Sequence, residues 1–224
     1  EMGIDKEGFC SVIMEGRGIP AKGAFPGSFS YGNDAVETVS YDPEEAKKLL
    51  EESGWTDTDG DGYVDKDGQK LTINWLTYPT RLEQPKLAEY AQATLKEIGI
   101  DVSVNNTSDH RTYAENGEFD VYVSSLTTAP TGDPEYFFSS TVTGSKNYGN
   151  YQNDEVTKLT EQLHQTFDTD ERGKLAVELQ QKILDDDAYF FVSHLNMGIV
   201  TKANVTGMAA HPCDYYEITA DLDV

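Results

Sequence analysis

The sequence predicts an α/β protein with a mixed β-sheet flanked by helices. The centre of the chain alternates in kind, because strand-like segments at 71–78, 101–104 and 119–126 are separated by stretches of helical spacing. The chain has 224 residues, of which 38% are hydrophobic and 11% aromatic, and this is enough to build a folded core. No apolar stretch approaches the roughly 18 residues that cross a bilayer.

The first predicted elements are a short helix, a loop and a well-marked helix. The opening "EMGIDKEGFCSVIMEG" has helical spacing and looks like a segment already under way, whereas the Pro- and Gly-rich stretch 16–34 disfavours regular structure. In the next helix, Asp42 suits the N-cap, Pro43 the first helical position and Gly54 the C-terminal stop.

The central elements alternate between strand and helix. "LTINWLTY" alternates as a strand does, and after it Leu87, Ala91 and Leu95 lie at helical spacing with Gly99 as terminator. The remaining central elements are a strand at "DVSV", a short helix at "HRTYAENG" and a strand at "FDVYVSSL".

The last part of the chain changes character. Two consecutive helices are predicted at 153–167 and 170–184. The segment "AYFFVSHLNMGIVTK" then favours strand structure with an interruption near Asn196, and the tail 214–224 has no helical pattern.

The net charge limits the classes of partner that the protein can bind. The formal net charge is −23, from 17 basic and 40 acidic residues, and this field makes nucleic acid and anionic membranes unfavourable partners.

Cys10 and Cys213 lie near opposite ends of the chain. The sequence leaves open whether they form a disulfide or stay as two buried thiols.

No catalytic motif stands out. The sequence has no H-E-x-x-H, nucleophile elbow, P-loop or G-x-G-x-x-G. Carboxylate pairs are abundant, as expected by chance in so acidic a sequence. The catalytic pair of a glycosidase-like hydrolase is recognised by the distance between its two carboxyl groups in the structure, and not by their spacing in the sequence. A hydrolytic enzyme and a partner-binding domain therefore stay open as alternatives.

The stretch "DTDGDGYVD" at 57–65 has the spacing of a calcium loop over its first nine positions. The twelfth position is Gly68, which supplies no bidentate carboxylate, and a strand follows where a second helix should begin. Two interpretations result: an Asx-turn connector, or a weak calcium site. The ligands of that calcium site would be Asp57, Asp59, Asp61 and Asp65.

Several ordered passages resemble one known family. The helix, Gly-Trp, Asp/Gly turn, "KDG" and strand of 41–81, followed by "LAEYAQATLKEIGIDVSV", "GEFDVYVSSLTTAPTGDPEYFFSS" and "YGNYQNDEVTKLTEQL", resemble the family 5 extracytoplasmic solute-binding proteins of ABC importers. These are the peptide- and nickel-binding group. Asp-rich turns at this point are typical of the family, which favours the connector and leaves adventitious calcium open.

The resemblance implies a fold and a division of the chain. It implies a periplasmic-binding-protein-like class II lobe, with residues 1–188 as the C-terminal lobe and 189–224 as a crossover strand and a segment returning toward a first lobe. It also implies a lipoprotein or periplasmic protein outside the cytoplasm, whose anchor region lies outside this chain, and an ABC permease as partner. Neither catalysis nor a required cofactor is implied.

The resemblance also implies binding residues. Arg81 matches the arginine that holds a ligand carboxylate, and Asp133 matches the aspartate that receives a ligand amino group. Thr127, Thr128 and Tyr136 would form another wall of the site. The two threonines stand where nickel-binding members tend to have bulky aromatics, and residues 143–151 contain no histidine where those members tend to have one. Direct imidazole coordination of nickel is therefore not expected, and a peptide or a metal chelate is.

Overall fold

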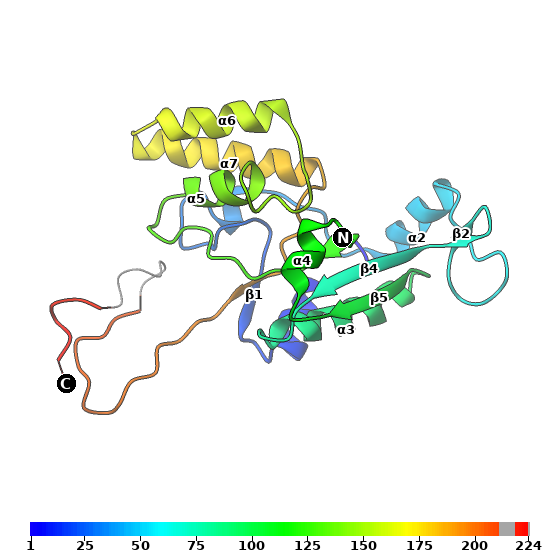
Figure 1. Cartoon of the computed structure of the whole chain (residues 1–224), viewed down its shortest axis with the longest axis horizontal. Helices are drawn as coiled ribbons and strands as arrows, with labels where there is room; N and C mark the ends of the chain where they lie inside the picture. Colours follow the sequence, from blue (N-terminus) through cyan, green and yellow to red (C-terminus); the bar gives the residue numbers. More distant parts are fainter. Residues whose placement is uncertain (211–217, 224) are drawn as a thin grey trace. The chain divides into compact units, whose positions relative to one another are not determined.

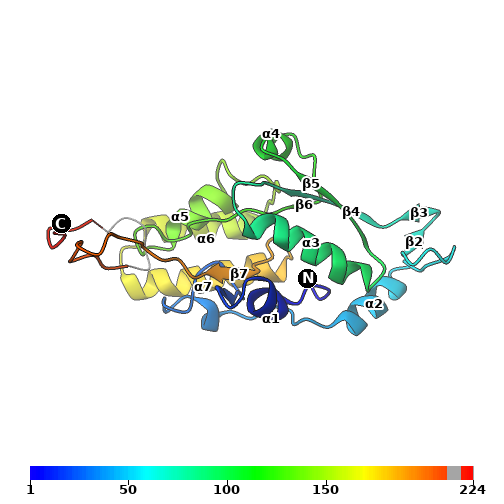
Figure 2. The same cartoon turned by 90° about the horizontal axis from the view of Figure 1, so that it is seen from below.

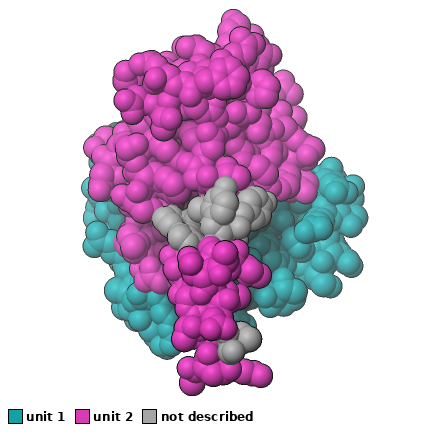
Figure 3. All heavy atoms as spheres, turned by 90° about the vertical axis from the view of Figure 1, so that its left-hand side faces the viewer, with its two compact units in different colours: residues 1–17, 39–125 teal, residues 18–38, 126–224 magenta. Residues whose placement is uncertain are grey.

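The computed structural model describes residues 1–210 and 218–223. The chain forms two compact units, shown in different colours in Figure 3. Unit 1 comprises Glu1–Arg17 and Val39–Ser125, and unit 2 comprises Gly18–Thr38 and Leu126–Val224. The expected division into a lobe of residues 1–188 and a crossover segment of residues 189–224 stays a prediction.

Unit 1 is built on a parallel sheet of three strands (Figure 1). The strands are β4 (Thr72–Thr77), β5 (Asp101–Asn106) and β6 (Val121–Tyr122), in the order β5-β4-β6. The expected third strand is shorter than predicted. After Tyr122 only the Val123 N–H still donates to Leu76 O, at 3.0 Å, and the Ser125 N–H donates to the Tyr78 hydroxyl at 3.2 Å instead of to a strand.

Helices α3 (Glu83–Lys96) and α4 (His110–Glu115) cover this sheet from opposite sides (Figure 2). Leu87, Ala91 and Leu95 are buried on the α3 face, as their spacing predicts. Gly99 has a φ of +82°. Helices often end on a residue in this left-handed conformation, and glycine adopts it with the least strain. The sequence therefore predicted this layer correctly.

The rest of unit 1 surrounds the sheet. Helix α2 spans Pro43–Glu52, and the Asp42 side chain caps it by accepting from Glu45 N at 2.9 Å. The short strands β2 (Asp65–Lys66) and β3 (Gln69–Lys70) form a hairpin through a two-residue Asp-Gly turn. The N-terminal helix is α1 (Lys6–Gly8) continued by the π-helix η1 (Phe9–Ile13).

Unit 2 is mainly helical. Its helices are η2 (Asn33–Ala35), α5 (Glu135–Phe137), the π-helix η3 (Phe138–Val142), α6 (Asp154–Gln165) and α7 (Thr169–Asp185). Its two strands, β1 (Gly18–Pro20) and β7 (Ser193–Leu195), pair antiparallel with Ile19 opposite His194. The long strand expected over 188–202 is reduced to β7, and β1 lies in a stretch expected to be loop. The core gathers Phe25, Phe137, Phe138, Leu163, Leu179 and Ile183.

A buried amide holds this core together. Gln180 on α7 is fully buried, and its Oε1 accepts from Ala24 N at 3.1 Å while its Nε2 donates to Tyr31 O at 2.7 Å. We expect Gln180→Leu to lower the free energy of unfolding by about 2 kcal/mol or more, because two buried backbone groups lose their partner. Urea denaturation measures this, and Gln181→Leu, at a half-buried position with its own bonds to Glu37, is the comparison. An unchanged midpoint in Gln180→Leu would contradict the assignment.

Candidate ligand-binding site

The carboxyl edge of the unit 1 sheet positions Arg81. Strand β4 ends at Thr77, and the chain turns through 78–82 before α3 begins. The connection after β4 leads to α3 and the connection after β5 leads to α4, and these helices lie on opposite faces of the sheet (Figure 2). In open parallel sheets, ligands bind outside the carboxyl ends where such connections diverge.

Arg81 is exposed at this edge, and its guanidinium makes no ion pair with any residue that the structure describes. Arg111, the second residue of α4, is likewise exposed and without an ion pair among the described residues. By contrast, Arg17 pairs with Glu15 at 3.1 Å. The Arg172 side chain is largely buried and forms ion pairs. The two arginines that remain for an anionic ligand therefore follow adjacent parallel strands.

A hydrogen-bond network around Ser125 fixes the turn that carries Arg81. The Ser125 N–H donates to the Tyr78 hydroxyl at 3.2 Å. The Ser125 hydroxyl accepts from Gln84 Nε2 at 2.6 Å and donates to Glu83 Oε1 at 3.0 Å. Sequence reasoning missed this network, because nothing local to Ser125 marks it.

An aromatic group lies beside the network. The His110 ring stacks on Tyr78 with ring centroids 4.1 Å apart, and its Nδ1 lies 2.7 Å from the Tyr122 hydroxyl. Burial, and secondarily the charge of Arg111, lower the pKa of His110. The imidazole is therefore neutral at pH 7, and it supports the edge as an aromatic and hydrogen-bonding group.

Asp133 lies in unit 2 and is engaged in an internal ion pair. Arg172 Nε donates to its Oδ2 at 2.8 Å and Arg172 Nη2 to its Oδ1 at 2.6 Å. The same guanidinium donates to Glu135 Oε2 at 2.9 Å and, through Nη1, to the carbonyls of Leu163 and Thr166, both at 2.6 Å. All five N–H groups of Arg172 are thus used.

This ion pair changes the acidity of both carboxyl groups. Burial works to raise the pKa of Asp133, but the hydrogen bonds from Arg172 and the Glu135 N–H outweigh it and hold the pKa below its usual value. The pKa of Glu135 is lowered in the same way, with burial opposed by bonds from His164 and Arg172. A ligand ammonium would have to share Asp133 with Arg172, so the ligand role implied for Asp133 stays a prediction.

The other expected wall residues differ in exposure. Thr127 is exposed and Thr128 half-buried. Tyr136 is 41% exposed, and its hydroxyl accepts from Lys146 Nζ at 3.0 Å. The structure places these three and Asp133 in unit 2 and Arg81 in unit 1. Their binding role stays a prediction.

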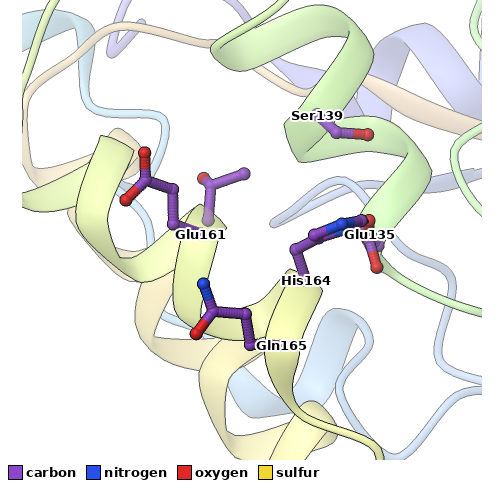
Figure 4. Close-up of a pocket in the computed structure, with 6 residues that line it drawn as sticks. Glu135, Ser139, Glu161, His164 and Gln165 are labelled. Atoms are coloured by element: carbon purple, nitrogen blue, oxygen red, sulfur yellow. The ribbon is translucent and has the colours of Figure 1, made fainter.

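A shallow hollow of about 440 Å³ opens on unit 2 between the α5–η3 segment and α6 (Figure 4). His164 Nδ1 lies 2.6 Å from Glu135 Oε1, and in the view of Figure 4 this pair and Glu161 lie on opposite sides of the hollow. The sequence did not indicate this hollow. Its lining is Glu135, Ser139, Thr160, Glu161, His164 and Gln165.

Comparison with known proteins places the chain in a family. Residues 1–149 match the profile described as bacterial extracellular solute-binding proteins, family 5 middle region. The chain belongs to this family. The resemblance seen in the sequence is therefore confirmed.

Similar proteins of known name are binding proteins. The family 5 chain is 32% identical to the oligopeptide-binding protein AppA of Bacillus subtilis, over 96% of this chain and 41% of that protein. It is 27% identical to the nickel-binding periplasmic protein of Escherichia coli, over 93% of this chain and 41% of that protein. The chain thus spans under half the length of these relatives.

Solved structures confirm the periplasmic-binding-protein-like fold. The structure of AppA in complex with a nonapeptide matches with a TM-score of 0.77 at 26% identity, over 95% of this chain and 44% of that chain. NikA of Staphylococcus aureus in complex with Ni(L-His)2 matches with a TM-score of 0.76 at 25% identity, over 94% and 44%.

In this family 5 chain the Asp-rich turn is satisfied largely by its own backbone. Asp57, Asp59 and Asp61 bring carboxylate oxygens within 4.8 Å of one another. Each of these side chains accepts from a backbone N–H of the turn, and Asp61 also pairs with Lys70 Nζ at 2.5 Å. Asp65 is not part of the group, because both its oxygens accept from Thr58. These are the bonds of an Asx-turn connector, and calcium binding stays a prediction.

Two further sequence expectations concern the chain ends and membrane spans. Cys10 is buried in η1, and Cys213 lies outside the described residues, as do residues 214–217 and 224 of the tail. Among the described residues, none of the helices is both long enough and apolar enough to pass through a bilayer.

Proposed function

We propose that this chain is one lobe of the substrate-binding component of an ABC importer. The whole protein captures a small solute with a carboxylate group, an oligopeptide or a nickel or other metal chelate, between two lobes and delivers it to a membrane permease. The names of the relatives support both solute classes, since AppA is an oligopeptide-binding protein and NikA was solved with Ni(L-His)2.

The observation that carries the proposal is Arg81. Its exposed guanidinium lies at the carboxyl edge of the sheet without an ion pair in the described part of the chain, although the formal net charge is −23. A guanidinium fork binds carboxylates with two parallel hydrogen bonds. An arginine left unpaired in so acidic a chain is a group that an incoming carboxylate would engage, and the resemblance to the family selects Arg81 over Arg111, which is equally unpaired among the described residues.

Capture needs no covalent step. A solute that contacts both lobes binds the closed form better than the open form, and this difference in affinity drives closure. We assign no catalytic residue, and the relatives named above are binding proteins. The same relatives support a location outside the cytoplasm, in the periplasm or at the cell surface.

The resemblance also implies binding residues in unit 2, and we propose their role separately from that of Arg81. Thr127, Thr128 and Tyr136 would supply hydroxyl groups and one aromatic ring to the solute. Asp133 would act mainly by holding its segment against Arg172, with bonds of 2.6 and 2.8 Å, and its ligand contact would be secondary.

A thermal-shift panel tests the function. The two-lobed protein that carries this chain is heated with tetra-alanine, with its C-terminal amide and with nickel–histidine. We expect stabilisation by one of the free-carboxylate ligands, of about 2.7 kcal/mol at a hundredfold excess over its dissociation constant, and no consumption of that ligand. Consumption would favour the hydrolase alternative, and no shift with any member would contradict a solute-binding role.

A further inference from the structure

We propose that Ser125 is a positioning residue that holds the Arg81 turn and thereby sets the preference for solutes with a free carboxylate. This inference rests on the proposed function, because it assigns Ser125 a role through Arg81. Nothing in the sequence around Ser125 indicates it, and the role follows from three hydrogen bonds that converge on one residue.

The directions of these bonds are fixed by the chemistry of the groups. A serine hydroxyl has one hydrogen to donate, and the carboxylate of Glu83, 3.0 Å away, can only accept. The hydroxyl oxygen must then accept from Gln84, so that side chain presents its Nε2, at 2.6 Å. The Ser125 hydroxyl thus orders two neighbouring side chains at once.

The network contacts residues on both sides of Arg81 in the sequence. Tyr78, whose hydroxyl accepts from the Ser125 N–H, is the first residue of the turn, and Glu83 and Gln84 follow the turn. The Gln84 N–H in turn donates to the Arg81 carbonyl at 3.1 Å. Ser125 therefore fixes the backbone that carries the Arg81 guanidinium.

Loss of the Ser125 hydroxyl would disturb this backbone through Gln84. Gln84 is only 4% exposed, and its Oε1 already has no hydrogen-bond partner among the described residues. Without the hydroxyl, its buried Nε2 would also lose its acceptor, and leaving such a group unsatisfied is costly. Relief requires movement of Gln84, whose N–H holds the Arg81 carbonyl.

The test uses two-lobed protein and compares two probes by calorimetry: tetra-alanine as the free acid and as the C-terminal amide. The ratio of their affinities measures the guanidinium–carboxylate contact, whereas a purely structural effect lowers both affinities equally. We expect Ser125→Ala to reduce this ratio about tenfold, and Ser125→Thr, which restores a hydroxyl, to recover most of it. Ser125→Cys, whose thiol is only a weak hydrogen-bond donor and acceptor, replaces Ser125→Ala if that variant does not fold.

A double-mutant cycle with Arg81→Ala separates the two levels of the proposal. If Ser125 acts through Arg81, Ser125→Ala changes nothing further once Arg81 is alanine. An unchanged ratio in Ser125→Ala, or an equal loss for both probes, overturns the positioning role while the effect of Arg81→Ala stands. Wild-type preference in Arg81→Ala overturns the binding role of Arg81 that carries the proposed function, and the role of Ser125 with it.

Discussion

Replacing Arg81 by alanine in the two-lobed protein is expected to weaken free-acid tetra-alanine by about 2–4 kcal/mol, roughly 30- to 900-fold in dissociation constant. This is the scale for removing one partner of a desolvated charge pair. Arg81→Lys should recover only part of the loss, since an ammonium is a point charge and cannot form the two parallel bonds of a guanidinium. Isothermal calorimetry gives both numbers.

The matched control is Arg17→Ala. Arg17 carries the same charge at an exposed position of unit 1, where it pairs only with Glu15. Its removal should leave the affinity within a few tenths of a kcal/mol. Equal losses in both variants would show that overall charge, and not a contact at the carboxyl edge, governs binding.

Replacing Arg172 by methionine is expected to lower the free energy of unfolding by about 2–4 kcal/mol, because the change leaves two carboxylates without their cation. The Arg172 side chain is 13% exposed, and its partners Asp133 and Glu135 are 40% and 25% exposed, so solvent softens the loss relative to a fully buried pair. Urea denaturation measures it. Lys174→Met, which breaks an exposed pair with Glu171, should cost under about 1 kcal/mol.

The loss in Arg172→Met should depend on pH. The folded-state pKa values of Asp133 and Glu135 lie below their usual values, so the ion pair stabilises the folded state above the ordinary carboxyl pKa of about 4. Protonation removes this stabilisation as pH falls through the lowered values. The difference between wild type and Arg172→Met should therefore be full near pH 7 and shrink below about pH 4. A difference that is independent of pH would mean that the pair is not ionic.

Several elements of unit 1, among them α2 and β4, were predictable because their cues are local. Asp42 followed by Pro43 begins α2, and Gly54, with φ of +85°, ends its turn. The alternation of residues 71–78 predicted β4, because strand side chains point to opposite faces in turn. These cues act over a few residues, and no tertiary contact overrides them.

Helix structure at residues 135–142 was missed, although a cue was present. Asp133-Pro134-Glu135 repeats the Asp-Pro-Glu pattern that begins α2, and Asp133 Oδ1 accepts from the Glu135 N–H at 2.9 Å as a capping residue does. From the sequence, no regular element was expected in this stretch. The partner of Asp133, Arg172, lies 39 residues further along and has no local mark in the helical pattern of α7.

The binding edge was predicted only in part. Arg81 came from resemblance to the family, and the structure adds that it follows β4 at the carboxyl edge without an ion pair among the residues described. The Ser125 network joins residues 41 to 47 positions apart, and only the paired sheet brings them together. Spacing along the sequence holds no information on such contacts.

Native mass spectrometry of the two-lobed protein, purified without refolding, tests the central claim most directly. We expect the wild-type protein to carry a co-purified small solute with a carboxylate group, and Arg81→Ala to lose it while Arg17→Ala retains it. The same solute at the same occupancy in all three proteins would contradict the claim that Arg81 binds the carboxylate.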